Sequence, residues 1–352
     1  MASRSKDDGL REAVTAAAHA AQERRFHRAS REASSWKSIA KTYMTEVEET
    51  RAHIDALLML NEADLKVVPI EPVGKKGDRH STSTACALLS DLHIDERVRP
   101  QEVPGGRNRF GPEVAEERID NFARNFIKLI DSARATTSIH QAALFALGDN
   151  FSGWIHPELM HSTEMTPIES IDWLQQRFVR LIDYLLKHSG LEKLHLLCMV
   201  GNHSRITMKE HSAPATASLE YILYRWLASH YGGEPRVKFQ VPQSKREVTT
   251  ISGVRVRWLH GNQWGYNRGT GGVVVPMQGA IKTWESGEPA DLTVCGHWHT
   301  YHPGRNTLIN GSLIGYTAYS SKFGPWEPPQ QAFFLLSDKY RRVTMHAPVF
   351  VE

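Results

Sequence analysis

The sequence predicts an α/β protein of layered sheets and helices, preceded by a helical extension. From residue 85 onward, short apolar runs of β type alternate with helical stretches, a pattern typical of layered α/β architectures. Residues 10–60 contain no Gly or Pro and are rich in Ala, Glu, Arg and Lys, which favours helix. The chain has 352 residues, of which 41% are hydrophobic, and it is therefore long enough to bury a full core.

The N-terminal segment 1–66 is predicted to form the helical extension. From Trp36 onward its apolar residues recur mostly at every third or fourth position, which predicts one apolar stripe along a helix. The stripe could pack on the following domain or pair with a second copy of the chain, so the extension is a candidate for oligomerisation or partner binding. Glutamates flank its arginine-rich stretch, 24–31, and a solvated helix face is a simpler interpretation than contact with nucleic-acid phosphates.

A linker is predicted at 67–84, where Pro69 and Pro72 are followed by glycines, lysines and a Ser/Thr run. The main domain is predicted at 85–352. Seven strands are predicted in it, at Ala85–Ser90, Ala142–Leu147, Leu194–Val200, Val254–Leu259, Leu292–Cys295, Thr307–Asn310 and Ala332–Leu336. Three helices are predicted, at Pro112–Ser132, Ile168–His188 and Ala215–His230.

Charge and cysteine content exclude several classes of protein. The formal net charge of +3 comes from 42 basic and 39 acidic residues, which is too balanced to indicate a nucleic-acid binder by bulk charge. No apolar run approaches the roughly 20 residues that span a bilayer, and the N-terminus lacks the apolar core of a secretory signal, so we expect a cytosolic protein without membrane partners. The three cysteines are widely separated in apolar stretches, which predicts buried side chains and neither disulfides nor a cysteine-type zinc site.

Polar residues of ligand type follow the ends of the predicted strands. Asp91 and His93 come two residues apart after the first strand, and on an extended backbone both would point to the same side and reach one metal ion. Asp149 follows a glycine after the second strand, where a tight turn would let its carboxylate bridge two cations. The third strand ends in Gly-Asn-His, which offers Asn202 as an oxygen ligand and His203 as a proton donor.

Two further strand ends carry histidines. His260 follows the fourth strand, and a Gly-His-Trp-His sequence after the fifth strand places His297 and His299 two residues apart. Any one of these histidines, taken alone, is more simply explained as a hydrogen-bonded structural residue. That interpretation does not account for five strand ends that all carry ligand-type residues, and the series as a whole predicts a metal site.

In chain order these motifs are Asp-x-His, Gly-Asp, Gly-Asn-His, His and Gly-His-x-His, and they resemble those of the calcineurin-like metallophosphoesterase superfamily. The resemblance covers roughly residues 86–336 and does not extend to the N-terminal helices. It implies a four-layer sandwich, in which two mixed β-sheets pack face to face and are flanked by helices, with the site at the strand ends. It also implies hydrolysis of a phosphoester by a hydroxide that bridges two metal ions.

The resemblance further implies a role for each matching residue. One metal would be held by Asp91, His93, Asp149 and His299, and the second by Asp149, Asn202, His260 and His297. The catalytic residue would be His203, as proton donor to the leaving oxygen. Carboxylate, amide and imidazole ligands suit Mn²⁺, which we expect first, and also Zn²⁺, Fe or Ni²⁺, rather than the all-oxygen coordination typical of Ca²⁺.

Two motif positions depart from the pattern of the superfamily. Many members carry an acid after Gly-Asn-His, whereas here Ser204 and Arg205 follow; the arginine could contact a substrate phosphate or form a surface salt bridge. The residues after Asp149, beginning with Asn150, lack the Asp-Arg-Gly continuation of the Ser/Thr protein phosphatases. The pattern is closer to the nuclease and phosphodiesterase branches, including phage-encoded members, and a phage protein would act in the host cytoplasm.

Aromatic residues gather near the motifs. Trp264 and Tyr266 follow the histidine of the fourth strand, and Trp298 lies between two predicted ligands. They could stack on nucleobases or cover the core at the strand ends. The predicted substrate contacts are Asn150, Arg205, Trp264 and Trp298.

Three functions are compatible with these features. The leading one is a phosphodiesterase or nuclease that acts on DNA, RNA or a small nucleotide. The second is a phosphomonoesterase that acts on a small phosphate or a phosphoprotein. The third is a non-catalytic interaction protein that retains the metal site, and the complete ligand set argues against it because a drifting site should lose at least one ligand.

Overall fold

The computed structural model describes residues 65–75, 78, 81–155, 159–207, 215–267, 272–318, 320–322 and 326–352, and separate positions between Glu23 and Val47. The chain divides into two units, 1–57 and 58–352. In the first unit every described residue is helical, as predicted for these positions, and the rest of the predicted extension lies outside the described residues. Within the described part of the chain, no helix is both long and apolar enough to cross a membrane.

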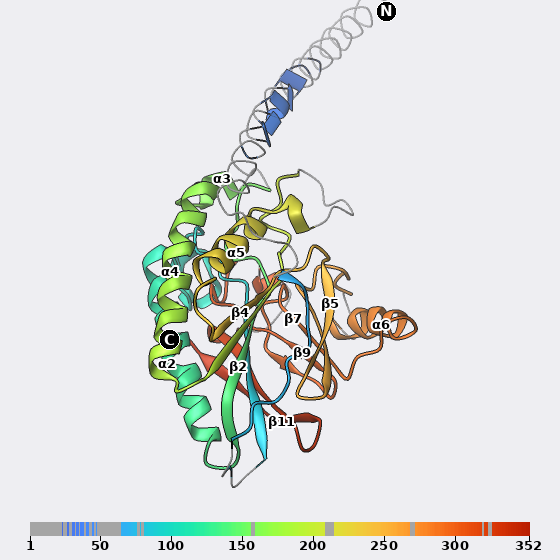
Figure 1. The fold of residues 1–352 in the computed structure, drawn as a ribbon. Helices are drawn as coiled ribbons and strands as arrows, with labels where there is room; N and C mark the ends of the chain where they lie inside the picture. Colours follow the sequence, from blue (N-terminus) through green and yellow to red (C-terminus); the bar gives the residue numbers. More distant parts are fainter. Residues whose placement is uncertain are drawn as a thin grey trace, which may run out of the picture. The chain divides into compact units, whose positions relative to one another are not determined.

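Two mixed β-sheets form the centre of the second unit (Figure 1). The larger sheet contains, in spatial order, β11 (Arg342–Phe350), β10 (Gln330–Ser337), β1 (Thr82–Leu89), β2 (Ser138–Ala146), β3 (Lys193–Cys198) and β4 (Val237–Gln240). The smaller sheet contains β5 (Arg246–Ile251), β6 (Val254–Leu259), β7 (Leu292–Cys295), β9 (Thr307–Ile309) and β8 (His302–Pro303). The run β1 to β4 is parallel, as are β6, β7 and β9, whereas the remaining pairs are antiparallel.

Helices cover the outer faces of both sheets (Figure 1). The described helices of this unit are α2 (Pro112–Ala133), α3 (Leu159–Ser162), α4 (Pro167–His188), α5 (Leu219–His230) and α6 (Val274–Glu285). Short 3₁₀ turns lie at Pro100–Glu102, Pro104–Gly106, Ala215–Ala217 and Ser320–Lys322. The side chain and backbone of Thr166 form a capping box with Glu169 that begins α4, an arrangement that satisfies otherwise unpaired N–H groups.

Side chains alternate between the two faces of each strand, so that one face packs in the core between the sheets and the other packs against the helices. Phe145 of the larger sheet and Trp258 of the smaller sheet pack in the core between the sheets, with ring centroids 6.2 Å apart. The next residue along β6, Leu259, faces the opposite way and packs against Met277 of α6, as a two-residue period requires. On the outer face of the larger sheet, the rings of Phe333 and of Phe126 from α2 have centroids 6.0 Å apart. The predicted four-layer arrangement of two mixed sheets flanked by helices is confirmed.

All seven predicted strands and all three predicted helices are present, and their ends either match the predicted ones or differ by a few residues. Strand β1 begins at Thr82, inside the segment predicted as a linker. Ile70, from the same segment, is buried between the sheets, and its backbone N–H donates to Thr250 O at 2.8 Å. The three cysteines are free and buried, as predicted. The fold thereby positions the loops that follow the parallel strands.

Candidate metal centre

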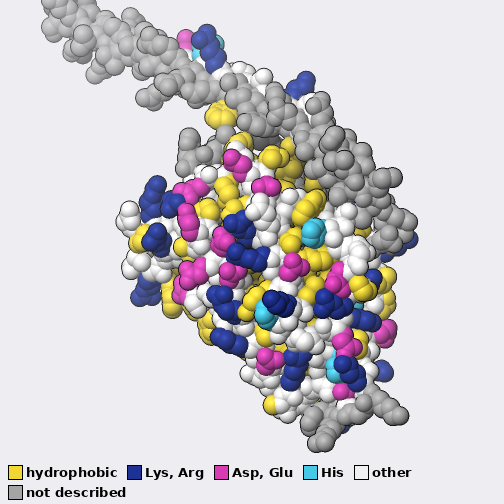
Figure 2. All heavy atoms as spheres, turned by 60° about the vertical axis from the view of Figure 1, so that its left-hand side comes forward, with side chains coloured by type: hydrophobic (Ala, Val, Ile, Leu, Met, Phe, Trp, Pro, Cys, Tyr) yellow, Lys and Arg dark blue, Asp and Glu magenta, His cyan; other side chains and the backbone are white. Residues whose placement is uncertain are grey.

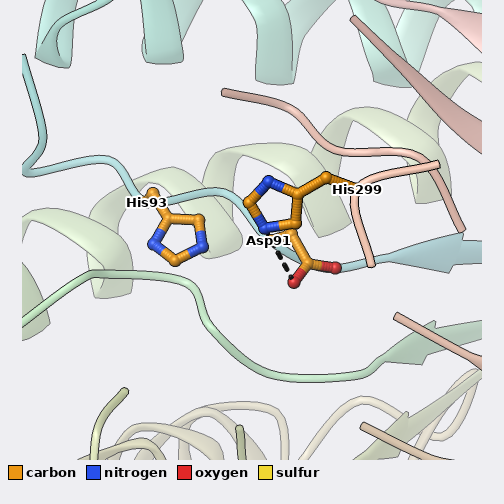
Figure 3. A group of neighbouring side chains, drawn as sticks. All are labelled: Asp91, His93 and His299. Atoms are coloured by element: carbon orange, nitrogen blue, oxygen red, sulfur yellow. Dashed lines mark ion pairs between the residues drawn. The ribbon is translucent and has the colours of Figure 1, made fainter. Parts of the chain in front are cut away.

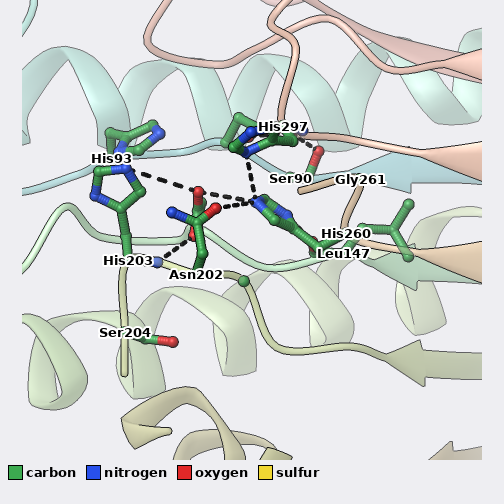
Figure 4. Close-up of polar contacts among 12 residues, drawn as sticks. Ser90, His93, Leu147, Asn202, His203, Ser204, His260, Gly261 and His297 are labelled. Carbon is green, nitrogen blue, oxygen red and sulfur yellow. Dashed lines mark hydrogen bonds and ion pairs between the residues drawn. The ribbon is translucent and has the colours of Figure 1, made fainter. Parts of the chain in front are cut away.

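The residues singled out by the motifs lie just beyond the strands that carry them. Asp91 and His93 follow β1, Asp149 follows β2, Asn202 and His203 follow β3, His260 follows β6, and His297 and His299 follow β7. Strands β1, β2 and β3 are parallel neighbours, and so are β6 and β7, so their carboxyl ends meet at the same edges. Both sheets therefore bring side chains to one place (Figure 4).

These side chains form two clusters that could each hold a metal ion. The first cluster is Asp91, His93 and His299 (Figure 3), and the second cluster is Asp149, His260 and His297. Within each cluster, one potential ligand atom of every residue lies within 4.8 Å of the others. His260 Nε2 lies 2.9 Å from Asp149 Oδ2, 3.2 Å from His297 Nδ1 and 3.1 Å from Asn202 Oδ1. That Asp149 bridges both clusters stays a prediction.

Backbone donors fix the two carboxylates. The N–H of His297 donates to both oxygens of Asp91, at 3.0 and 2.9 Å, so a residue of the second cluster orients the acid of the first. The N–H of His203 donates to Asp149 Oδ1 at 2.8 Å, which leaves Oδ2 toward His260. Both acids are almost fully buried, and their orientation is set by the protein itself.

The backbone at this site is strained. Among the described residues, seven non-glycine residues have a positive φ, and five of them, with φ between 47° and 71°, are predicted ligands: Asp91, His93, Asp149, His297 and His299. Such a conformation costs on the order of 1–3 kcal/mol per residue, although Asp and His adopt it more readily than most. The extended backbone that we predicted for Asp91 and His93 is therefore wrong. Strand β1 ends at Leu89, and both side chains reach the first cluster from a left-handed turn.

The motif glycines allow these turns to approach one another. Gly148 has a φ of 85°, and a Cβ on it would overlap the backbone of Gly201. A Cβ on Gly201 would in turn overlap the carboxylate of Asp149, and one on Gly296 would lie 2.6 Å from Asp91 Oδ2. Glycine is needed at these positions because the backbone of one strand end passes directly against a predicted ligand from another.

Hydrogen bonds to one ring nitrogen of His93 leave the other for a ligand. Nδ1 lies 2.7 Å from Ser152 Oγ, and this hydroxyl donates to Glu96 Oε2 at 2.8 Å. The hydroxyl therefore accepts from Nδ1–H, which leaves the lone pair on Nε2. Nε2 of His93 is buried and has no partner among the described residues, which is unfavourable unless something coordinates it.

His260 and His203 are oriented in the same way (Figure 4). Nδ1 of His260 lies 2.7 Å from Leu147 O, which can only accept, so Nε2 is the nitrogen that faces Asp149. Nδ1 of His203 lies 2.9 Å from Ser152 O, and its Nε2 lies 4.0 Å from Asp149 Oδ2. His203 therefore reaches the edge of the site without belonging to either cluster.

Burial and mutual charge shift the ionisation of these groups in the metal-free chain. Burial lowers the pKa of His93 well below its usual value and lowers the pKa of His297 to about 3. Burial acts in the same direction on His260, but the Asp149 carboxylate outweighs it and raises the pKa of His260 to about 9. Burial alone would raise the pKa of Asp149, yet the neighbouring histidines hold it well below its ordinary value. A buried, charged carboxylate is thus balanced by a protonated imidazole, a role that a bound cation would take over.

Glu220 belongs to the site, although the motifs do not reveal it. It is fully buried on α5 and accepts four hydrogen bonds from two of the turns that carry predicted ligands. Its Oε1 accepts from N and Nδ2 of Asn150 at 2.7 and 2.6 Å, and its Oε2 accepts from Gly201 N and Ser204 Oγ at 2.7 and 2.8 Å. Burial, and then the charge of Asp149, raise the pKa of Glu220.

The hydrogen bond from Ser204 to Glu220 occurs where the sequence departs from the motif pattern. Ser204 stands where many members of the resembled superfamily carry an acid, and it donates to Glu220, sixteen residues later. A carboxylate from α5 thus reaches the turn from a different part of the chain. The available sequence signal is a glutamate within the apolar stretch that begins with Leu219.

Two of the predicted substrate contacts make hydrogen bonds within the protein. Asn150 is fully buried, and its Nδ2 also donates to Tyr224 OH at 2.8 Å. Arg205 donates from Nη1 to Asn202 O at 2.6 Å and from Nε to Thr207 O at 3.1 Å, so it holds the loop that follows Gly-Asn-His. Contact of either residue with substrate stays a prediction.

The other two predicted contacts, Trp264 and Trp298, lie beside the second cluster. The ring of Trp298 meets the ring of His297 edge to face at 4.9 Å, and its Nε1 donates to Gly261 O at 3.1 Å. Trp264 is 8% exposed and packs in the core beneath α6. Both tryptophans line a cavity at the site.

The face drawn in Figure 2 interleaves Lys and Arg side chains with Asp and Glu side chains. Ion pairs on α2 and α4 show the same balance, since Arg180 pairs with both Glu116 and Asp120. The described residues of this face present no continuous basic area. The described residues of this face therefore form no continuous basic track of the kind that binds nucleic-acid phosphates without regard to sequence.

No protein-family model matches the sequence, and no curated protein matches it. Solved structures with a similar arrangement include vacuolar protein sorting 29 from Cryptosporidium parvum, at 16% identity and a TM-score of 0.33, with 73% of this chain and 86% of that chain covered. A hypothetical protein from Pyrococcus horikoshii has 12% identity and a TM-score of 0.34, over 76% and 89% of the two chains. A 5'-nucleotidase precursor from Thermus thermophilus has 11% identity and a TM-score of 0.27, over 76% and 54%. Likenesses of this size do not establish a shared activity.

Proposed function

We propose that the protein is a phosphoester hydrolase of the calcineurin-like metallophosphoesterase superfamily, that it uses two divalent metal ions, and that it cleaves phosphodiester bonds in nucleic acids or nucleotides. The observation that carries the proposal is the pair of clusters, each of which joins one carboxylate to two histidines at adjoining strand ends. Structural ion pairs do not require two such groups side by side, whereas a two-metal centre does.

The residues present fit this pair of metal ions. One ion would be held by Asp91, His93 and His299, and the other by Asp149, Asn202, His260 and His297, with Asp149 shared. The buried, unpartnered Nε2 of His93 and the buried carboxylates support this assignment. When bound, two such ions lower the pKa of a water molecule, hold phosphate oxygens and neutralise the charge that develops during attack on phosphorus.

The chain's own residues orient the two carboxylates and protonate the leaving oxygen. The backbone N–H groups of His203 and His297 hold the two carboxylates in fixed directions, so little rearrangement is needed at the site. The carbonyl of Ser152 fixes Nδ1 of His203 as the protonated nitrogen. Its Nε2 consequently faces the site and, in the protonated ring, donates a proton to the leaving oxygen.

Turnover assays test the proposal. The full chain, loaded with Mn²⁺, is incubated with bis(4-nitrophenyl) phosphate, single-stranded DNA, RNA and 4-nitrophenyl phosphate, and its metal content is measured in parallel. We expect hydrolysis of the diester and of at least one nucleic acid, and no hydrolysis by the Asp149→Asn variant. Hydrolysis confined to the monoester would replace the proposal with a phosphomonoesterase or phosphoprotein phosphatase. Bound metal without any turnover would favour a non-catalytic interaction protein.

A further inference from the structure

A cavity of about 240 Å³ adjoins the candidate metal centre. One histidine from each cluster, His299 and His297, forms part of its wall. Four aromatic residues line it as well, namely Trp264, Tyr266, Trp298 and Tyr316. A group bound in this cavity would therefore lie next to a phosphate held at the clusters.

The size of the cavity limits what it can accept. Pockets for drug-sized ligands occupy about 300–1,000 Å³, and this cavity is smaller. It fits one ring system rather than a stretch of polymer. Its aromatic walls favour a flat ring, because ring faces stack on one another.

The aromatic walls are held in place by the fold. Trp298 is fixed through its Nε1, and Trp264 packs in the core beneath α6. Asn108 donates from Nδ2 to Tyr316 O at 2.8 Å and to Ile314 O at 2.8 Å, which ties the segment that carries Tyr316 to the loop before α2. A ligand would thus meet preformed walls, and little entropy would be lost in ordering them.

Polar groups at the wall distinguish between flat rings. Glu327 lines the cavity, and its Oε2 accepts from Tyr301 N at 2.9 Å and from Gln330 Nε2 at 3.0 Å, so the carboxylate is oriented and offers an acceptor. The wall therefore offers a fixed acceptor. A plain phenyl ring has no polar N–H to donate to it, whereas the edge of a nucleobase carries donors.

We propose that this cavity binds a single unpaired nucleobase of the substrate, while the adjoining phosphate lies at the metal clusters. This inference rests on the proposed function and narrows it. A base can enter a cavity that holds a single ring system only when the base is neither stacked nor paired. The substrate is therefore a nucleotide unit or a single-stranded segment. A duplex base would first have to be extruded, which costs a few kcal/mol.

A binding experiment tests the inference separately from catalysis. The full chain loaded with Mn²⁺ is titrated with adenosine 5'-monophosphate, ribose 5-phosphate and phenyl phosphate, and tryptophan fluorescence is recorded because two tryptophans line the cavity. All three probes bring the same phosphate, but only the first brings a base. We expect adenosine 5'-monophosphate to bind at least about fivefold more tightly than the other two, which is the lower end of the effect of one base–aromatic stack.

Substitutions of aromatic residues test whether the preference for the base arises in this cavity. Tyr316→Ala should remove most of the preference for the base and leave the affinity for ribose 5-phosphate unchanged, whereas the exposed Tyr340→Ala should keep the preference. Tyr266→Ala provides the same comparison if Tyr316→Ala does not fold, as judged by circular dichroism. Equal binding of adenosine 5'-monophosphate and ribose 5-phosphate by the unaltered chain would overturn the inference and leave the phosphate site intact. Equal binding of phenyl phosphate would overturn the assignment to a base, and failure of all three to bind would overturn the proposed function as well.

Discussion

Replacement of Glu220 by Gln should weaken metal binding far more than it weakens the fold. The amide oxygen can still accept from the Asn150 turn, but the NH₂ group then faces the N–H of Gly201, which cannot accept. One unsatisfied buried N–H costs about 1–3 kcal/mol. Removal of the charge offsets part of this cost, because the Asp149 carboxylate repels that of Glu220. We therefore expect the free energy of unfolding to fall by only about 1 kcal/mol.

The effect on the candidate metal centre should be larger. Gly201 precedes the predicted ligand Asn202, so a peptide that is no longer held at Gly201 displaces the ligand directly. Loss of a partner that supports a metal ligand commonly reduces metal affinity or activity about 10- to 100-fold. Two measurements check this: the Mn²⁺ concentration that gives half-maximal hydrolysis should rise by such a factor, and urea unfolding should report the small loss of stability. Glu117→Gln, which alters an exposed glutamate of α2, should change neither.

Two results would refute this reasoning. If Glu220→Gln has the metal dependence and the stability of the unaltered chain, the four hydrogen bonds do not hold the site. If it instead loses several kcal/mol of stability and keeps its metal dependence, Glu220 supports the fold rather than the ligands.

Three further outcomes are expected. His203→Ala should keep its metal content and lose about 10²- to 10⁴-fold in turnover, and an equal loss of both in parallel assays would contradict a role in proton donation. Gly201→Ala should lower metal content and reduce the free energy of unfolding by about 2 kcal/mol or more, since its Cβ would overlap Asp149; Gly233→Ala, where a Cβ has open space, is the control for both measurements. His195 lies on β3, and burial followed by two nearby lysines lowers its pKa to about 4. The unfolded chain therefore binds that proton more tightly, and stability should be lost as the pH falls from 6.5 to 4, by up to about 3 kcal/mol. His195→Phe should flatten this part of the pH dependence in urea unfolding, and an unaltered slope would contradict the assignment.

The predicted elements were those whose pattern is local and strong. Val254–Leu259 forms a strand with unchanged bounds, because its apolar residues alternate with arginines and place Val254, Val256 and Trp258 on the face that packs in the core between the sheets. Helix α6 was missed because Pro276 and Gly279 lower its helical propensity, and packing of Met277 against the smaller sheet overrides that propensity. Strand β11 was missed because it is a largely exposed edge strand with polar residues and Pro348, which an edge tolerates.

The sequence predicted which side chains gather at the candidate site, but not the geometry of the turns that carry them. The motifs place Asp91, Asn202 and His297 after strand ends, and parallel strands bring those ends together. The left-handed turns were not foreseen, because they arise where one strand end passes against another. Glu220 was not foreseen either, because its contacts with the ligand-bearing turns form only when α5 packs on the larger sheet.

The left-handed turns at Asp91, Asp149 and His297 restrict how this protein can diverge. A substitution by Val or Ile at any of them would remove a ligand and also place a β-branched residue where its backbone is strongly disfavoured. Asn and Gly adopt this conformation at little cost, so they offer a route to a metal-free descendant that still folds. Relatives of this chain that no longer bind metal should therefore carry Asn or Gly at these three positions, because these residues tolerate the left-handed backbone conformation.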